Sequence, residues 1–233
     1  MDEKEKTGGP DLSLVMPCLN EEANLGFCIR QAREYLETCG LSGEILLVDN
    51  GSTDRSAAIA AELGAVVIPE PRRGYGRALR TGLARTRGAV VIMGDCDSTY
   101  DFLHLDPIYR PLAGGEADVM IGDRFAGQME RGAMPPLHRL GVPFLSLCGR
   151  LRWNVSVHDF HCGLRGLTRS ALEQVELRTD GMEFSTELIA EAARKGLRLG
   201  EASVPLRRSQ YERKPKLRTF RDGFRHLRYI LKG

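Results

Sequence analysis

The sequence predicts an α/β fold with a mostly parallel central sheet and helices on both of its faces. The first 125 residues alternate short β-branched runs with helix-like segments, which is the pattern of repeated strand–helix–strand units. Three of the predicted strands are followed directly by the polar motifs PCLNEE, DNGSTD and GDCD. Because ligands bind such sheets beyond the carboxyl ends of the strands, these motifs predict a shared site at one edge.

The strands of the first half are short apolar runs bounded by turn residues. We expect them at residues 12–16, 45–48, 66–68, 89–93 and 119–121. The first helix is predicted to reach about residue 39, with Asn20 as its cap and with Glu21 and Glu22 in its first turn. An alanine-rich helix that ends at residue 63 and a helix at 74–86 follow.

The second half is less regular. The segment 134–154 is rich in proline, leucine, glycine and arginine, and we expect a helical hairpin there. A strand at 160–168, an amphipathic helix at 184–195 and a strand at 199–204 should complete the sheet and its cover. The last helix is predicted at 219–231, where apolar residues recur at helical spacing and basic residues occupy the other faces.

Length and composition are typical of a soluble globular protein. The chain has 233 residues, of which 42% are hydrophobic and 27% charged, so we expect one main domain, at 12–204. A flexible N-terminal arm at 1–11 and a basic tail at 205–233 should flank it. No apolar run is long enough for a transmembrane helix, the charged N-terminus lacks a signal-peptide core, and the six cysteines form no CxxC pair. Together these features predict a cytoplasmic protein.

The charge is unevenly distributed along the chain. From residue 205 onward, ten basic and two acidic residues give +8, whereas 23 basic and 29 acidic residues before it give −6. A basic tail on an acidic body suggests an anionic partner such as a phosphate, a membrane surface or a nucleic acid. A solvated basic surface without a partner is the alternative.

The run AVVIMGDCDSTYDF is the most informative stretch of the chain. Asp95 and Asp97 follow a short buried strand, with Asp101 close behind. Two neighbouring carboxylates repel each other unless a positive charge lies between them, and a hard divalent cation that also holds substrate phosphates would supply it. A plain acidic turn is the alternative, but the other strand-end motifs favour a metal site.

Seven motifs in this order resemble those of the inverting family-2 glycosyltransferases with the GT-A fold. They are LVMPCLNEEANL, LLVDNGSTDRSAAIA, RGYGRALRTGL, VIMGDCDSTYDF, DVMIGDRF, DFHCGLRGLTR and MEFSTELIAEAARKG. The resemblance covers residues 12–230 and is nearest to the polyprenyl- (dolichyl-) phosphate sugar transferases. It implies a Rossmann-like three-layer sandwich and a UDP- or GDP-sugar donor. A dinucleotide-binding fold is disfavoured because no glycine-rich turn follows the first strand.

The resemblance implies that the first two strand-end loops hold the nucleoside of the donor, through Pro17, Leu19, Asn20, Glu21, Asp49, Gly51, Ser52 and Asp54. Asp49 could accept a hydrogen bond from the base, and Glu21 from the ribose hydroxyls. Helix capping by Asn20 and Asp54 is a second interpretation, and both can hold. Asn50 stands where many relatives carry a second acid, so the base stays open. The next segment is expected to meet the nucleotide through Arg73, Gly74 and Gly76.

At the acidic turn the resemblance implies a bound Mg²⁺ or Mn²⁺. Asp97 matches the direct ligand, and Asp95 matches a residue nearer the ribose or a metal-bound water. The cation would bridge the diphosphate and neutralise the charge that develops on the leaving group. Metal-binding relatives often carry Gln where this chain has Thr99, so the third protein ligand stays open.

On the acceptor side, Arg124 matches a phosphate-binding arginine, although an ion pair with Asp123 or another acid is an equal alternative. Asp159 and Glu183 resemble acceptor-side carboxylates, and we expect them to be catalytic together with Asp97. One of them would be the general base for a hydroxyl acceptor, whereas a lipid phosphate is already ionised. In the tail, a basic segment that closes over the diphosphate is implied at Arg213, Lys216 and Arg218.

These observations predict a metal-dependent inverting glycosyltransferase that acts on a polyprenyl phosphate. The helix after residue 219 would lie on an anionic membrane surface or a membrane partner protein, at the inner face of the membrane, or would pack on the domain. A family-2 enzyme that acts on a hydroxyl of a glycan or small molecule is the alternative. No nucleic-acid partner is expected, because acidic clusters repel phosphates without a metal.

Overall fold

A computed structural model of the chain describes residues 8–209 and 219–232. Its strands are β1 (Leu12–Cys18), β2 (Gly43–Asp49), β3 (Val66–Pro69), β4 (Val90–Met93), β5 (Val119–Asp123), β6 (Arg165–Thr168) and β7 (Leu199–Ser203). Its helices are α1 (Glu22–Thr38), α2 (Ser56–Glu62), α3 (Tyr75–Leu83), α4 (Asp106–Ala113), α5 (Pro136–Trp153), α6 (Arg169–Gln174), α7 (Phe184–Arg194) and α8 (Thr219–Lys232). Residues 1–7 of the predicted arm and 210–218 of the predicted tail lie outside the described residues.

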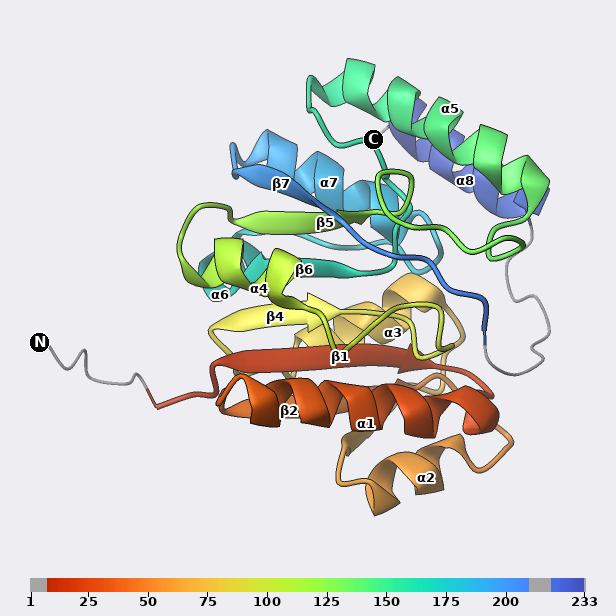
Figure 1. Ribbon diagram of the computed structural model, residues 1–233. Coiled ribbons are helices and arrows are strands. Elements are labelled where there is room, and N and C mark those ends of the chain that lie inside the picture. The colour runs from red at the N-terminus through yellow and green to blue at the C-terminus, as the bar shows by residue number, and fades with distance from the viewer. Residues whose placement is uncertain (1–7, 210–218, 233) are drawn as a thin grey trace, which may run out of the picture.

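The strands form one seven-stranded sheet in the order β3-β2-β1-β4-β6-β5-β7 (Figure 1). β1 pairs in parallel with β2 along its whole length and with β4 over its first four residues. β6 runs antiparallel to both β4 and β5, and β7 runs parallel to β5. The α/β fold with a mostly parallel sheet, predicted from the sequence, is confirmed.

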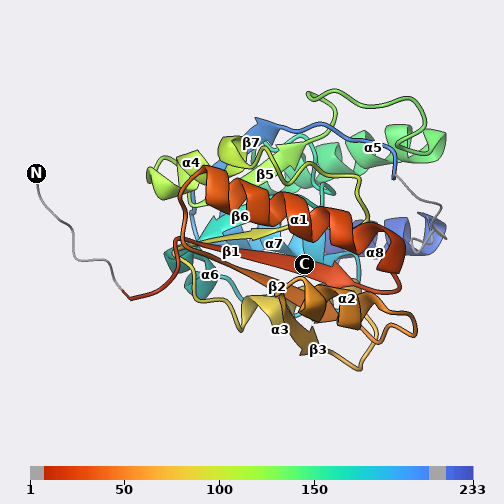
Figure 2. The ribbon, with the colours of Figure 1, turned by 60° about the horizontal axis from the view of Figure 1, so that its bottom comes forward.

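Helices cover both faces of the sheet. Seen from two directions, α1 and α4 lie on one face and α3 on the other (Figures 1 and 2). Small residues allow the close contact: a Cβ at Gly82 of α3 would lie 2.6 Å from Val15 and 2.7 Å from Val48. On the opposite face, a Cβ at Gly166 of β6 would lie 2.6 Å from Leu112 of α4. The two-sided cover explains why the strands read as continuous apolar runs.

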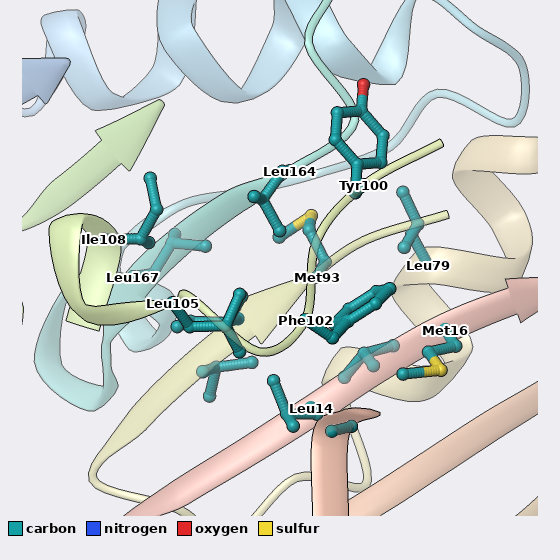
Figure 3. Close-up of a cluster of buried hydrophobic side chains, with 14 of the residues drawn as sticks. Leu14, Met16, Leu79, Met93, Tyr100, Phe102, Leu105, Ile108, Leu164 and Leu167 are labelled. Carbon is teal, nitrogen blue, oxygen red and sulfur yellow. The ribbon is translucent and has the colours of Figure 1, made fainter. Parts of the chain in front are cut away.

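A cluster of buried side chains anchors the segment that follows β4 (Figure 3). Phe102 is only 1% exposed and lies among side chains from β1, β4 and α3. A Cβ at Gly94 would come within 2.8 Å of the Phe102 ring, so the chain turns tightly here. Burial of one such side chain contributes roughly 1.5–3 kcal/mol. The acidic turn after β4 is therefore held between a buried strand and a buried aromatic residue.

Two predictions for the second half were wrong in detail, and two helices, α4 and α6, were missed. Residues 134–154 contain a single helix, α5, instead of a hairpin, because Pro143 removes only one helical hydrogen bond and the helix packs along α7 and α8. The strand expected at 160–168 is limited to β6. Of the missed helices, α4 contains Pro107 and Pro111, which obscure the helical pattern although a proline in the first turn is well tolerated. Helix α6 has only 6 residues, too few for a clear apolar period.

The predicted C-terminal amphipathic helix is present as α8 and lies beside α5 (Figure 1). Its inward face is formed by Asp222, His226 and Ile230, which are all buried. Phe220 and Phe224 are exposed, so much of the apolar stripe points away from the domain. Among the described residues, no helix is both long and apolar enough to cross a bilayer.

Candidate active site

The sheet brings the three polar loops together at one edge. In the β1–β2 ladder Cys18 is opposite Asp49, and in the β1–β4 ladder Val15 is opposite Met93. The loops that start after these strands therefore leave the sheet side by side, although they are far apart in the sequence. This is the convergence that the strand-end motifs predict.

The first two loops are joined by hydrogen bonds. The Asn20 N–H donates to the Ser52 hydroxyl at 2.9 Å, and the Thr53 N–H donates to Asn20 Oδ1 at 2.7 Å. Asn20 itself adopts a left-handed conformation, with φ of 53°. Glu21, not Asn20, occupies the N-cap position of α1, so the amide of Asn20 supports the second loop instead of capping the helix.

Asp54 does have a capping role. Its carboxylate accepts hydrogen bonds from the backbone N–H of Ser56 at 3.0 Å, from the Ser56 hydroxyl at 2.6 Å and from the Glu22 N–H at 3.1 Å. Burial alone would raise the pKa of Asp54, but these hydrogen bonds outweigh it and lower the pKa. The carboxylate thus stays ionised at the starts of two helices, where negative charge is favourable.

Glu21 and Asp49 lie at the same edge. Glu21 is buried, and its Oε2 accepts a hydrogen bond from Asn24 at 3.1 Å. Asp49 is half-buried, and its Oδ1 accepts from the Ser52 N–H at 2.9 Å. Gly51, in the loop that follows Asp49, has φ of 82°, which favours glycine. Carboxylates in this position can accept hydrogen bonds from base and ribose donors.

Asn50 has a structural function that the sequence did not reveal. Its amide nitrogen donates to the carbonyl oxygens of Glu70 and Arg72, at 2.9 and 2.8 Å, and its oxygen accepts from the Gly74 N–H at 2.8 Å. A carboxylate at this position could not donate either of the first two bonds. Asn50 therefore fixes the turn before α3, and Arg73 is tied to the same loop by a 2.9 Å bond to the Gly51 carbonyl.

The glycines before and in α3 are explained by a neighbouring segment of the protein. A Cβ at Gly74 would collide with the Asp180 carbonyl, and one at Gly76 would lie 2.6 Å from the Thr179 carbonyl. The segment 179–181 thus packs closely on the start of α3. Tyr75, between the two glycines, donates its hydroxyl to Asp95 Oδ1 at 2.9 Å.

In the acidic turn after β4, Asp97 is 6% exposed and accepts hydrogen bonds from the backbone N–H and the hydroxyl of Thr99. Ser98, between Asp97 and Thr99, has φ of 62°. Thr99 therefore lies in the same turn as Asp97 and holds the Asp97 carboxylate in place through these hydrogen bonds. The carboxylate of Asp101 is contacted by Arg207, His104 and Gln31.

The donor atoms of Asp95 and Asp97 fit a hard cation, because Mg²⁺ and Mn²⁺ prefer carboxylate oxygens. Among the described residues the two do not belong to a set of three potential ligands whose atoms lie within 4.8 Å of one another. Mg²⁺ is commonly held by one or two carboxylates, with waters and substrate phosphates completing its shell. The acidic turn therefore fits a cation that arrives with a diphosphate better than a preformed all-protein site.

On the other side of the site, Arg124 and Asp159 form a buried ion pair. Arg124 Nε and Nη2 donate to the two oxygens of Asp159 at 2.6 and 2.8 Å, and the Asp159 side chain is fully buried. The alternative of an ion pair for Arg124, left open by the sequence, is thus observed, with Asp159 as the partner. Glu183 pairs with Arg225 of α8 at 2.6 Å, a contact that the sequence did not suggest.

A second cluster of potential ligands lies near Asp159 and was missed in the sequence. Ligand atoms of Asp123, His158 and Glu201 lie within 4.8 Å of one another. Glu201 already accepts hydrogen bonds from the backbone N–H and the ring Nδ1 of His158, so the cluster fixes the loop after α5. Arg213, Lys216 and Arg218 lie outside the described residues, and their role stays a prediction.

Comparison with known proteins identifies relatives of this chain. A model of the family described as Glycosyl transferase family 2 matches residues 13–176. The low-salt glycan biosynthesis hexosyltransferase Agl6 of Haloferax volcanii is 40% identical over 95% of this chain, which spans about half (53%) of that relative's length. The dolichyl-phosphate hexose transferase of the same organism is 33% identical, over 88% of this chain and 86% of the relative.

Solved structures resemble the fold. Glucosyl-3-phosphoglycerate synthase from Mycobacterium tuberculosis, in complex with Mn²⁺ and UDP-glucose, superposes with a TM-score of 0.74. The match covers 96% of this chain and 78% of that one, at 24% sequence identity. At this identity the likeness supports the arrangement of strands and helices, which is the predicted GT-A fold.

Proposed function

The chain belongs to glycosyl transferase family 2, and we propose that it transfers a hexose from a UDP- or GDP-sugar to a polyprenyl phosphate, with inversion at the anomeric carbon. The observation that carries the donor half of this proposal is the convergence of three polar loops at the ends of β1, β2 and β4. The reaction would take place at the cytoplasmic face of a membrane.

In the donor half, Glu21 and Asp49 would accept hydrogen bonds from the nucleoside, and Arg73 would face its phosphates. Asp95 and Asp97 would hold a Mg²⁺ or Mn²⁺ that neutralises the diphosphate leaving group. The hydroxyl of Tyr75 and the backbone of Thr99 orient these two carboxylates. Positioning and electrostatic stabilisation would thus account for catalysis without a covalent enzyme intermediate.

The acceptor half is supported by the partners of the two predicted acceptor-side carboxylates. Asp159 is bound by Arg124, and Glu183 by Arg225. To act as a general base for a hydroxyl acceptor, either carboxylate would have to leave its ion pair. A phosphate acceptor needs no such base, because it is already ionised at neutral pH. The ion pairs therefore favour a phosphate over a hydroxyl acceptor.

A lipid acceptor is supported by the surface that α5 and α8 share. Eight of the ten large hydrophobic side chains that are exposed among the described residues lie on these two neighbouring helices. They are Leu137, Leu140, Phe144, Leu147, Leu151, Phe220, Phe224 and Leu231; we call this set the α5–α8 face. Exposed basic residues accompany it, at Arg139, Arg152, Arg221, Arg228 and Lys232.

The composition of the α5–α8 face is typical of a protein surface that binds a membrane. Apolar side chains that insert among lipid tails, with basic side chains at the level of the head groups, are typical of interfacial helices. Each basic residue near an anionic surface contributes roughly 1 kcal/mol. A bilayer with anionic lipids is therefore the partner that we propose for this face, and it would present a polyprenyl phosphate nearby.

The test is product analysis by mass spectrometry. The protein would be incubated with a panel of UDP- and GDP-sugars and a short polyprenyl phosphate, with Mg²⁺, with Mn²⁺ or with EDTA. The matched control acceptor is the same polyprenol without its phosphate. We expect a hexosyl phosphoryl polyprenol only in the presence of the phosphate and a divalent cation. Equal transfer to the free polyprenol, or to a soluble hydroxyl acceptor, would contradict the proposal.

A further inference from the structure

Helix α8 contacts the segment that carries Glu183. Arg225 Nη2 lies 2.6 Å from Glu183 Oε1, and the Glu183 side chain is almost completely buried just before α7. Arg225 also packs on Gly181, where a Cβ would come within 2.6 Å of the guanidinium. Any side chain at position 181 would therefore displace Arg225 from this position. The guanidinium thus packs closely on Gly181 and forms an ion pair with the carboxylate of Glu183.

Arg225 is the contact that orients the Glu183 carboxylate. The other carboxylate oxygen, Oε2, is buried and has no hydrogen-bond partner among the described residues. A buried oxygen without a hydrogen-bond donor costs free energy. The ion pair with Arg225 is therefore the interaction that stabilises this orientation of the Glu183 carboxylate. Among the described residues, the ion pair with Arg225 is the charged contact that holds Glu183 in place.

A second contact links α8 to the loop that follows Asp159. His226 of α8 lies 2.8 Å from the Thr186 hydroxyl, and its ring meets the His161 ring edge-on, with centroids 4.2 Å apart. The backbone N–H of His161 donates to Asp159 Oδ1 at 3.1 Å. Helix α8 is thus in contact with both segments that bear a predicted acceptor-side carboxylate.

The Glu183 segment continues into the donor side of the site. The backbone of residues 179–181 packs on Gly74 and Gly76 at the start of α3, and Asp180 forms ion pairs with Arg77 and Arg80. From α3, Tyr75 reaches Asp95. A continuous series of packed contacts therefore leads from α8 to the acidic turn.

We propose that Arg225 is a positioning residue for the transfer reaction. It holds Glu183 and the segment 179–184 in the arrangement that the reaction requires, so that the acceptor side is complete only when α8 is docked on the domain. The proposal rests on the proposed function, because it assigns Glu183 to the acceptor side. It adds that a helix outside the strand-end loops controls the rate of the chemical step.

The test is a double-mutant cycle between Arg225 and Glu183. We expect R225A to lower kcat by about 10-fold or more, the usual effect of losing a charge-assisted hydrogen bond, with the Kd of the donor unchanged in calorimetry. In an E183Q background, the same change at position 225 should cost nothing further, because Arg225 acts through Glu183. R110A, which breaks the exposed ion pair between Arg110 and Asp106 on α4, is the control for the loss of one positive charge and should keep the wild-type kcat.

Three results would overturn the proposal. They are a wild-type kcat in R225A, equal losses from R225A in the wild-type and E183Q backgrounds, and a loss confined to donor binding. If R225A does not fold, R225K keeps the charge but loses the planar fork, and the cycle is measured with that variant. If the wild-type protein transfers sugar only to a hydroxyl acceptor, the proposed function fails, and the cycle is measured on that reaction.

Discussion

Asp97 is the residue whose charge matters most for the proposed chemistry. The variant D97N keeps Oδ1 as an acceptor for the Thr99 N–H but removes the negative charge that a divalent cation requires. We expect the transfer rate to fall by about 100-fold or more, or about 2.7 kcal/mol. Initial rates at saturating donor and Mn²⁺ measure this effect, and circular dichroism should show a melting temperature within about 2 °C of wild type.

A matched control for Asp97 is Asp106 of α4. Its carboxylate is bound by the Tyr35 hydroxyl and by Arg110, away from the strand-end loops. D106N should therefore keep the wild-type rate. A fully active D97N would remove the metal assignment from the acidic turn.

The structure, but not the sequence, indicates that Asn50 is needed for the stability of the fold. The variant N50D would lose two donated hydrogen bonds and would place a carboxylate against the carbonyl oxygens of Glu70 and Arg72. We expect the free energy of unfolding to fall by about 1–3 kcal/mol, measured by urea denaturation. N20D is the control, since Asn20 is exposed and its Oδ1 acceptor is retained; its effect should stay within about 0.5 kcal/mol. An N50D protein as stable as N20D would contradict this account.

Residue types and spacing were sufficient to predict which loops form the site, but not how their side chains are paired. Asp95 and Asp97 follow a strand in the sequence itself, so their place at the sheet edge could be predicted. The partners of Glu183 and Asp159 could not, because Arg225 is 42 residues from the first and Arg124 is 35 residues from the second. Such pairs depend on how distant elements pack, and a single sequence carries no periodic signal for that.

At the scale of elements, the α5–α8 face is the surface whose exposure is hardest to explain without a partner. The double variant L140Q/F144Q should lower binding to anionic vesicles by about 10-fold or more, because burying each side chain is worth roughly 1.5–3 kcal/mol. Co-sedimentation with vesicles measures the effect. V66Q is the control, because Val66 is also exposed but lies on β3, at the edge of the sheet. Unchanged vesicle binding by the double variant would remove the membrane role of this face.

The docking of α8 should depend on pH through its buried histidine. Burial, together with the charges of Arg165 and Arg225, lowers the pKa of His226 from 6.5 to about 3. Below pH 6.5 the unfolded chain therefore binds a proton that the folded protein does not accept until about pH 3. The stability linked to His226 is complete above pH 6.5 and falls by about 1.4 kcal/mol per pH unit below it.

Urea denaturation between pH 7.5 and 5 tests this linkage. The wild-type protein should lose stability as the pH falls, and His161, whose pKa burial also lowers, should add to the loss. H226Q, which retains a polar group next to Thr186, should show a weaker pH dependence than wild type. Identical slopes for the two proteins would mean that His226 is not buried in its neutral form.

The elements of the first half were predictable because each carries its own signal. β1 to β4 are β-branched runs bounded by turns, and the helices between them follow a regular apolar spacing. The exceptions are α4 in the first half and α5 in the second, because both contain prolines in their interiors. Only packing against the rest of the domain makes these two segments helical. The outward direction of the apolar stripe of α8 was equally hidden, since the spacing of apolar residues does not tell which face meets the domain.

At the scale of the whole molecule, the site joins parts of the chain that only the complete fold brings together. The strand-end loops follow β1, β2 and β4, whereas Glu183 lies just before α7 and Arg225 lies in α8, much later in the sequence. A ligand that contacts the strand-end loops must therefore stabilise the folded protein as a whole, because unfolding would separate them. The gain is RT ln(1 + [L]/Kd), or about 2.7 kcal/mol at a donor concentration of 100 Kd.

Thermal unfolding with and without the cation provides the last prediction. For a chain of this size, a gain of that order should raise the melting temperature by about 5–10 °C when UDP- or GDP-sugar and Mn²⁺ are both present. Replacing Mn²⁺ by EDTA should abolish most of the increase, because the diphosphate would then face Asp95 and Asp97 without a neutralising charge. The D97N variant should show only a small increase in melting temperature, both with Mn²⁺ and with EDTA. An equal increase for wild type with Mn²⁺ and with EDTA would mean that the acidic turn takes no part in holding the donor.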